Sequence, residues 1–128
     1  MAVPRISPED LAPRLESAAG AAASDAPLIV DVRLKYPYEH STMTLPGALR
    51  LLPGETAHRE WPCDRDIVLY DSDPDDIVAE RAALDLQRLG CRVLVLEGGI
   101  AAWAAARLPT SPKTAPQLAS PMGVPAKA

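Results

Sequence analysis

Residues 66–90, with the sequence DIVLYDSDPDDIVAERAALDLQRLG, predict a buried strand, a short acidic loop and an amphipathic helix. Residues 67–70 form an unbroken apolar run, which is typical of a strand covered on both faces in a parallel sheet. After the loop, apolar side chains recur on one face of a helix that Gly90 ends. In open α/β sheets a strand-to-helix turn of this kind lies at the carboxyl edge of the sheet, where such folds bind ligands.

The loop of this stretch carries four carboxylates within six residues. Its members are Asp71, Ser72, Asp73, Pro74, Asp75 and Asp76. Asp73 is a preferred helix N-cap residue and Pro74 a preferred first helical residue, and the acids after Pro74 would face the positive end of the helix dipole. We therefore expect the helix to begin at Pro74 and the loop to form the candidate active-site segment.

The remaining chain alternates strands and helices with short connections. Strands are predicted at residues 28–32, 48–51 and 92–96, and helices are predicted to begin at Pro8 and at Gly99. This alternation predicts an α/β fold with a parallel sheet and helices on both of its faces. The Pro-rich residues 110–128 are expected to form a disordered tail after a single domain at residues 1–109.

The composition argues against several classes of function. A chain of 128 residues suits one domain, and a formal charge of -4 argues against a nucleic-acid partner, which would favour a basic face. No apolar run approaches the roughly 18 residues of a membrane span, and the N-terminus lacks the apolar core of a secretory signal. We therefore expect a cytoplasmic protein with no nucleic-acid or membrane partner, present as a monomer or a weak dimer.

The two cysteines, Cys63 and Cys91, are too few for a disulfide scaffold, and cytosolic thiols are normally reduced. Each precedes a predicted strand, so both should lie at the amino ends of strands, on the side opposite the acidic loop. Cys91 is expected to be a small buried apolar residue, and Cys63 to be exposed and incidentally reactive.

Three further motifs occur in the order and spacing of a known family. They are LIVDVR at residues 28–33, LPGA at 45–48, and LEGGIAAW at 96–103 followed by Leu108 and Pro109. Together with the strand at 67–70, these motifs resemble the rhodanese (sulfurtransferase) domain over roughly residues 6–109. The resemblance implies a single rhodanese-like domain with a central five-stranded parallel sheet, in which the strand ending at Tyr70 is central and the strand from Arg92 lies beside it.

The resemblance also shows where this chain departs from the family. Active members have a cysteine directly after the central strand, where it carries the transferred sulfur, and here that position is Asp71. One branch of the family has a second cysteine where this chain has Asp73, and the family's Gly-His pair is Met43 and Thr44 here. A carboxylate cannot carry sulfane sulfur. The resemblance therefore implies a degenerate site, in which Asp71 serves as a structural anion that accepts loop N–H bonds.

Asp31 and Arg33 end the strand at 28–32 near the same pocket. Active relatives use such residues mainly to brace the loop, so we expect a buried ion pair or hydrogen bond between them. Arg81, one turn into the helix, is expected to pair with Asp85 or to fold back toward the acidic loop. Asp31, Arg33 and Arg81 are the predicted pocket-bracing residues.

Two functions from different classes are consistent with these patterns. The first is a catalytically inactive rhodanese-like module that binds a protein or small molecule, or regulates a partner. The alternative is an enzyme: a sulfurtransferase acting through Cys63, or a metal-dependent phosphohydrolase in which Asp71 attacks phosphorus and Asp73 acts as acid and base. A calcium loop agrees less well, since Asp76 and Ala82 occupy the positions of its Gly and Glu. We expect no cofactor and no bound metal.

Overall fold

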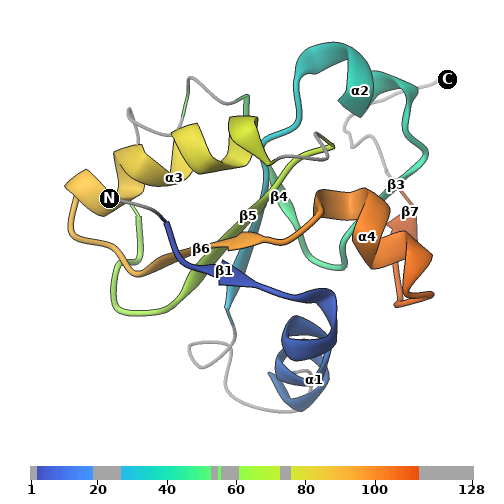
Figure 1. The fold of residues 1–128 in the computed structure, drawn as a ribbon, viewed down its shortest axis with the longest axis horizontal. Coiled ribbons are helices and arrows are strands. Elements are labelled where there is room, and N and C mark those ends of the chain that lie inside the picture. Colours follow the sequence, from blue (N-terminus) through green and yellow to red (C-terminus); the bar gives the residue numbers. More distant parts are fainter. Residues whose placement is uncertain (1–2, 19–26, 53–54, 56–60, 73–75, 113–128) are drawn as a thin grey trace, which may run out of the picture.

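In a computed structural model of the 128-residue chain, residues 3–18, 27–52, 55, 61–72 and 76–112 are described. Among them, five parallel strands form one sheet with the order β1-β6-β5-β2-β4 (Figure 1). The strands are β1 (Arg5–Ile6), β2 (Leu28–Asp31), β4 (Leu49–Arg50), β5 (Ile67–Tyr70) and β6 (Val93–Leu96). β5 is central and β6 lies beside it, which confirms the predicted sheet.

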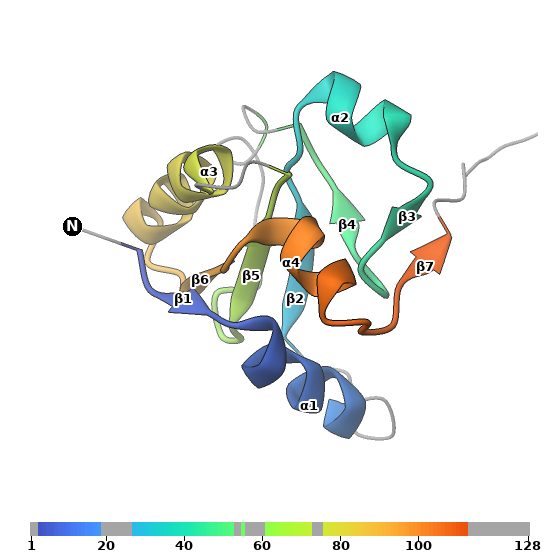
Figure 2. The same ribbon diagram turned by 45° about the vertical axis from the view of Figure 1, so that its right-hand side comes forward.

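Helices cover both faces of this sheet (Figures 1 and 2). α3 (Ile77–Arg88) packs on one face, and α1 (Pro8–Ala18) and α4 (Gly99–Ala105) pack on the other. The short helix α2 (Lys35–His40) follows β2. The predicted α/β class is thus confirmed. In the part of the chain that the structure describes, no helix is long and apolar enough to cross a membrane.

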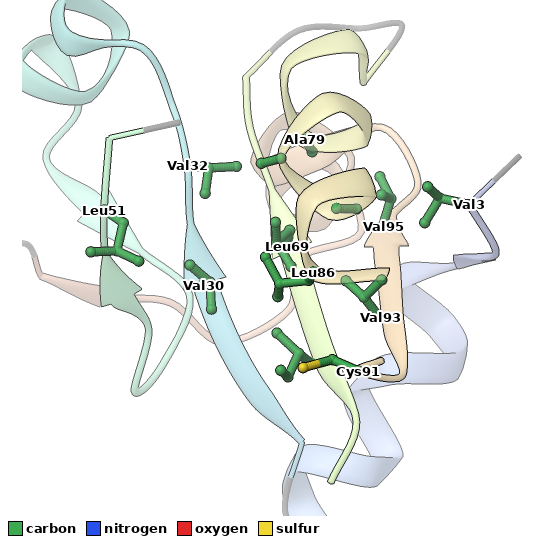
Figure 3. Close-up of a cluster of buried hydrophobic side chains, with 13 residues drawn as sticks. Val3, Val30, Val32, Leu51, Leu69, Ala79, Leu86, Cys91, Val93 and Val95 are labelled. Atoms are coloured by element: carbon green, nitrogen blue, oxygen red, sulfur yellow. The ribbon is translucent and has the colours of Figure 1, made fainter. Parts of the chain in front are cut away.

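The sheet separates two hydrophobic clusters, because successive strand side chains point to opposite faces. In β5, Ile67 and Leu69 belong to the larger cluster, which packs against α3 (Figure 3). Val68 and Tyr70 belong to the smaller cluster beneath α1 and α4, where Trp103 is the largest fully buried side chain. All four residues of β5 are fully buried, as their apolar run predicted.

The register of the central strands brings the ends of β2 and β5 together. Val30 lies beside Leu69, and Asp31 lies beside Tyr70. Parallel strands that end in register share one carboxyl edge, so the residues after β2 lie next to the start of the acidic loop.

A second, antiparallel sheet pairs β3 (Met43–Thr44) with β7 (Ser111–Pro112). No sequence pattern predicted it, because a strand of two residues is too short to show a period. This pairing extends the described fold to residue 112, beyond the predicted domain end at 109. Residues 113–128 lie outside the described residues, so the tail at that end stays a prediction.

The two cysteines form a disulfide, so the prediction of two reduced thiols is wrong. Cys63 precedes β5 and Cys91 precedes β6, at the amino ends of the strands as expected. The parallel pairing of these strands, in which Ile67 lies beside Val93, brings together two cysteines that are 28 positions apart in the sequence. Cys91 is buried in the larger core cluster, as predicted (Figure 3).

Candidate functional site

Asp71, the residue after β5, is buried and bound to the first turn of α3. The residue is 1% exposed, and its Oδ2 accepts a hydrogen bond from the N–H of Ala79 at 2.7 Å. Ala79 is the third residue of α3, and its N–H is one of those that a helix leaves without an intrahelical partner. Asp71 thus caps α3 from outside the helix, with its carboxylate at the positive end of the helix dipole.

α3 begins at Ile77, so the predicted helix start at Pro74 is wrong. Asp76, its N-cap, has a left-handed backbone with φ 60° and ψ 28°. Residues other than glycine rarely adopt this conformation, and it interrupts the right-handed geometry that a helix through Asp76 would need. Asp73, Pro74 and Asp75 lie outside the described residues.

The Asp76 side chain is buried and links three segments of the chain. Its Oδ2 accepts hydrogen bonds from Nη1 of Arg5 at 2.6 Å and from the N–H of Gly98 at 3.0 Å. Arg5 belongs to the edge strand β1 and Gly98 precedes α4, so Asp76 joins the start of α3 to both. Its other oxygen, Oδ1, is buried and accepts no hydrogen bond within the described part of the chain.

The Gly98–Gly99 pair at the start of α4 packs against Asp71 and Asp76. The N–H of Ile100 donates to the carbonyl oxygen of Asp71 at 3.1 Å, and Gly99 has a φ of 62°. A Cβ atom at Gly99 would overlap that same carbonyl oxygen of Asp71. Both the backbone conformation and the available space therefore require glycine at position 99.

Gly99→Ala is expected to lower the free energy of unfolding by about 2–4 kcal/mol, since a left-handed alanine and an overpacked contact each add a penalty. Gly90→Ala is the matched control, because Gly90 also has a positive φ (89°) but nothing lies within 4 Å of an added Cβ. The control should lose only about 1 kcal/mol. Urea denaturation measures both variants. Equal losses would show that the Asp71 carbonyl moves aside at no cost.

A second cluster lies at the end of β2, where Asp31 and Arg33 form the predicted buried ion pair. Nε of Arg33 donates to both carboxylate oxygens at 3.0 Å, and Nη2 donates to Oδ2 at 2.6 Å. The hydroxyl of Tyr70 donates to the same Oδ2 at 2.8 Å. Burial opposes the charge of Arg33, but its hydrogen bond and attraction to Asp31 outweigh this effect, and the pKa of Arg33 is raised. Burial also raises the pKa of Tyr70, which keeps its hydroxyl neutral as a donor.

Arg50, at the end of β4, completes this second cluster. Its Nη1 donates to the carbonyl oxygens of Arg33 (2.6 Å), Leu51 (3.0 Å) and Asp31 (3.3 Å). Its guanidinium carbon lies 4.0 Å from the centre of the Tyr38 ring, a cation–π contact. Nη1 is also 3.6 Å from Oδ1 of Asp31, so this one carboxylate faces two guanidinium groups.

The predicted site residues that the structure brings together form two neighbouring groups. Tyr70 hydrogen-bonds Asp31 in one group, and the next residue, Asp71, caps α3 in the other. Ser72 is exposed beside them. Arg81 is exposed on α3 and takes part in no ion pair among the described residues, so its predicted bracing role has no support from contacts there.

Sequence reasoning missed Tyr70, Arg50 and Arg5 as members of these groups. Tyr70 belongs to the apolar run at 67–70, but a buried tyrosine hydroxyl usually needs a hydrogen-bond partner, and this requirement indicates a polar role. Arg50 is a charged residue inside a short apolar segment, which also indicates a paired role. No sequence pattern indicates a role for Arg5, because β1 is only two residues long.

A metal site is not assembled by the part of the loop that the structure describes. Among the described residues, no group of three or more His, Cys, Asp or Glu side chains could hold a metal ion. Asp73 and Asp75, which the metal-dependent alternative would also use, lie outside the described residues.

The fold and these contacts define the class of protein. It is an α/β domain whose candidate site is the turn between β5 and α3, and Gly98 and Gly99 at the start of α4 pack against this turn. Residues 9–106 match the family described as the rhodanese-like domain. The chain therefore belongs to the rhodanese-like domain family. No curated protein matches the sequence at a significant level.

Solved structures share this fold. A full-length protein from Lactobacillus plantarum is 22% identical, with a TM-score of 0.73 over 85% of this chain and 88% of that one. A rhodanese homologue from Thermus thermophilus is 27% identical, with a TM-score of 0.55 over 76% of this chain and 96% of that one. A protein of unknown function from Rhodopseudomonas palustris, described as a possible tyrosine phosphatase, is 22% identical, with a TM-score of 0.69 over 85% of each chain.

Proposed function

We propose that this rhodanese-like domain does not transfer sulfur and acts as a binding or regulatory module. One observation carries the proposal: Asp71 stands where the family resemblance places the persulfide-forming cysteine, and its carboxylate is buried against the first turn of α3. A carboxylate cannot hold sulfane sulfur. In this position it brings to the helix N-terminus the negative charge that a persulfide would otherwise bring.

The cysteines of this chain offer no substitute nucleophile near Asp71. Cys63 and Cys91 are joined in a disulfide, so neither presents a thiolate in this state. They precede β5 and β6, whereas Asp71 follows β5. The four residues of β5, at ~3.3 Å each, separate its two ends by about 13 Å. This separation supports the proposal against a sulfurtransferase that uses Cys63.

The metal-dependent phosphohydrolase has less support. An aspartyl nucleophile must present a carboxylate oxygen to the phosphorus atom. Oδ2 of Asp71 is instead held by the N–H of Ala79, and the residue is buried. The possible phosphatase among the solved structures shares the fold at 22% identity, which does not transfer an activity to this chain.

The protein is expected to show no thiosulfate:cyanide sulfurtransferase activity, because no thiol lies at the turn after β5. The assay measures thiocyanate formed by the oxidised protein and by the protein reduced with a phosphine, beside an active rhodanese. Cys63→Ser is the control for the reduced protein, since reduction frees that thiol. Turnover comparable to the active enzyme would refute the proposal, and its loss in Cys63→Ser would assign the reaction to Cys63.

A further inference from the structure

A pocket of about 290 Å³ lies between α2 and the chain that follows β4. Its lining residues are Lys35, Tyr38, Glu39, Arg50, Leu51, Leu52 and Glu55. β2 and β4 are paired neighbours, and the lining comes from the segment after β2, from the end of β4 and from the chain after β4, so the pocket lies at the carboxyl edge of the sheet. Figure 2 shows α2 beyond the end of β4 at this edge. Asp71 is not part of its described lining.

Arg50 is a fixed positive group in the wall of this pocket. Three backbone carbonyls hold its Nη1, and the ring of Tyr38 supports the guanidinium plane at 4.0 Å. Nε and Nη2, which form the side fork of the guanidinium, make no hydrogen bond with the described residues. The side chain is 23% exposed and Arg50 lines the pocket, so a ligand that enters the pocket meets this side chain. A guanidinium fork of this kind matches a carboxylate with two parallel hydrogen bonds.

The charge of Arg50 is only partly neutralised inside the protein. The carboxylate of Asp31 lies 3.6 Å away but already binds Arg33 and the hydroxyl of Tyr70. One carboxylate therefore serves two guanidinium groups, and burial lowers the pKa of Arg50 despite its attraction to Asp31. Asp31, Arg33 and Arg50 share one carboxylate between two guanidinium groups, and an anionic group bound at the fork of Arg50 would supply a second negative charge.

The other charged residues of the pocket limit how much negative charge it can accept. Lys35 and Arg50 are balanced in formal charge by Glu39 and Glu55. Oε1 of Glu55 accepts the N–H of Leu52 at 2.8 Å, which holds this carboxylate at the pocket. A dianion such as phosphate or thiosulfate would therefore meet two carboxylates of like charge, whereas a single negative charge at Arg50 would be tolerated.

The rest of the wall is apolar. Leu51 is buried, Leu52 is 45% exposed, and Tyr38 contributes its ring. The volume lies near the lower end of small-molecule sites, which span about 300–1,000 Å³. We propose that this pocket binds a small monocarboxylate with an apolar or aromatic body, whose carboxylate pairs with Nε and Nη2 of Arg50.

Benzoate is the probe for this proposal, because it joins one carboxylate to a flat apolar ring. Isotope-labelled protein is titrated with sodium benzoate at constant ionic strength and followed by amide NMR signals. We expect saturable shifts at Tyr38, Leu51 and Leu52. Sodium phosphate, titrated in the same way, should bind more weakly than benzoate.

Two variants test the residues that the proposal uses. Arg50→Lys keeps the charge but loses the planar fork, so benzoate should bind about tenfold more weakly or worse. Leu52→Glu adds a carboxylate to the apolar wall at an exposed position and should abolish saturable binding. Leu89→Glu is its matched control, because Leu89 is 52% exposed at the end of α3, outside the pocket, and should bind as the wild type does.

The proposal is overturned if benzoate causes no saturable shifts, if phosphate binds as tightly as benzoate, or if Leu52→Glu keeps the wild-type affinity. The last comparison stands even where Arg50→Lys fails to fold, since Leu52 is outside the core. Thiocyanate formation is measured separately from benzoate binding. A negative result for the pocket can therefore be distinguished from a result that contradicts the absence of sulfurtransferase activity.

Discussion

Asp31→Ala is expected to lower the free energy of unfolding by about 3–5 kcal/mol, the usual cost of removing one partner from a buried ion pair. Asp31 and Arg33 have side chains that are each 1% exposed. After the substitution the Arg33 guanidinium and the Tyr70 hydroxyl lose their common acceptor in the interior. An arginine cannot escape this cost by giving up its proton, because its pKa is too high.

Urea denaturation followed by circular dichroism measures this loss. Asp85→Ala is the control, because it removes a pair with the exposed Arg88 (3.3 Å) and should cost less than about 1 kcal/mol. Asp31→Asn keeps the shape and one acceptor oxygen but removes the charge, so its loss should be intermediate. If Asp31→Ala costs no more than Asp85→Ala, the buried cluster does not stabilise the fold as inferred.

Reduction of the Cys63–Cys91 disulfide is expected to lower the free energy of unfolding by about 3–4 kcal/mol, from the loop-closure entropy of a link with a sequence separation of 28. The linked segment contains β5, the acidic loop and α3, which together form the central unit of the fold. In the unfolded chain this link restrains the whole segment, and its loss leaves the folded contacts of β5 and β6 unchanged.

Denaturation of the wild type with and without a phosphine reductant measures this effect. The double variant Cys63→Ala/Cys91→Ala is the control, since it cannot form the link and its midpoint should not respond to the reductant. Thiol alkylation followed by intact mass determination counts free cysteines in the untreated protein. Two alkylated cysteines in the untreated, folded protein would contradict the disulfide.

Much of the central unit was predictable, because its signals are local in the sequence. The apolar run at 67–70 predicted a strand covered on both faces, and β5 is fully buried. The predicted start of α3 at Pro74 is wrong, because the local preference of Asp and Pro for a helix start is weaker than the contacts that hold Asp76. The start is at Ile77, where Asp76 is held by Arg5 and Gly98 from other parts of the chain.

The candidate site was predictable in part for the same reason. Asp31 and Arg33 are two residues apart at the end of a strand, so their pairing is a local property, and it is present. Their partners Tyr70 and Arg50 come from neighbouring strands, and only the parallel register places them at the same carboxylate.

The sequence by itself determined the α/β class, the central strand and the position of Asp71 directly after it, because periodicity and motif order depend on residues close together in the chain. Only the tertiary structure decided the Cys63–Cys91 disulfide, the link from Asp76 to Arg5 and the need for glycine at position 99. Each of these depends on which distant segments pack side by side. That arrangement is set by burial of the two faces of the sheet, a property of the whole chain that no short stretch of sequence contains.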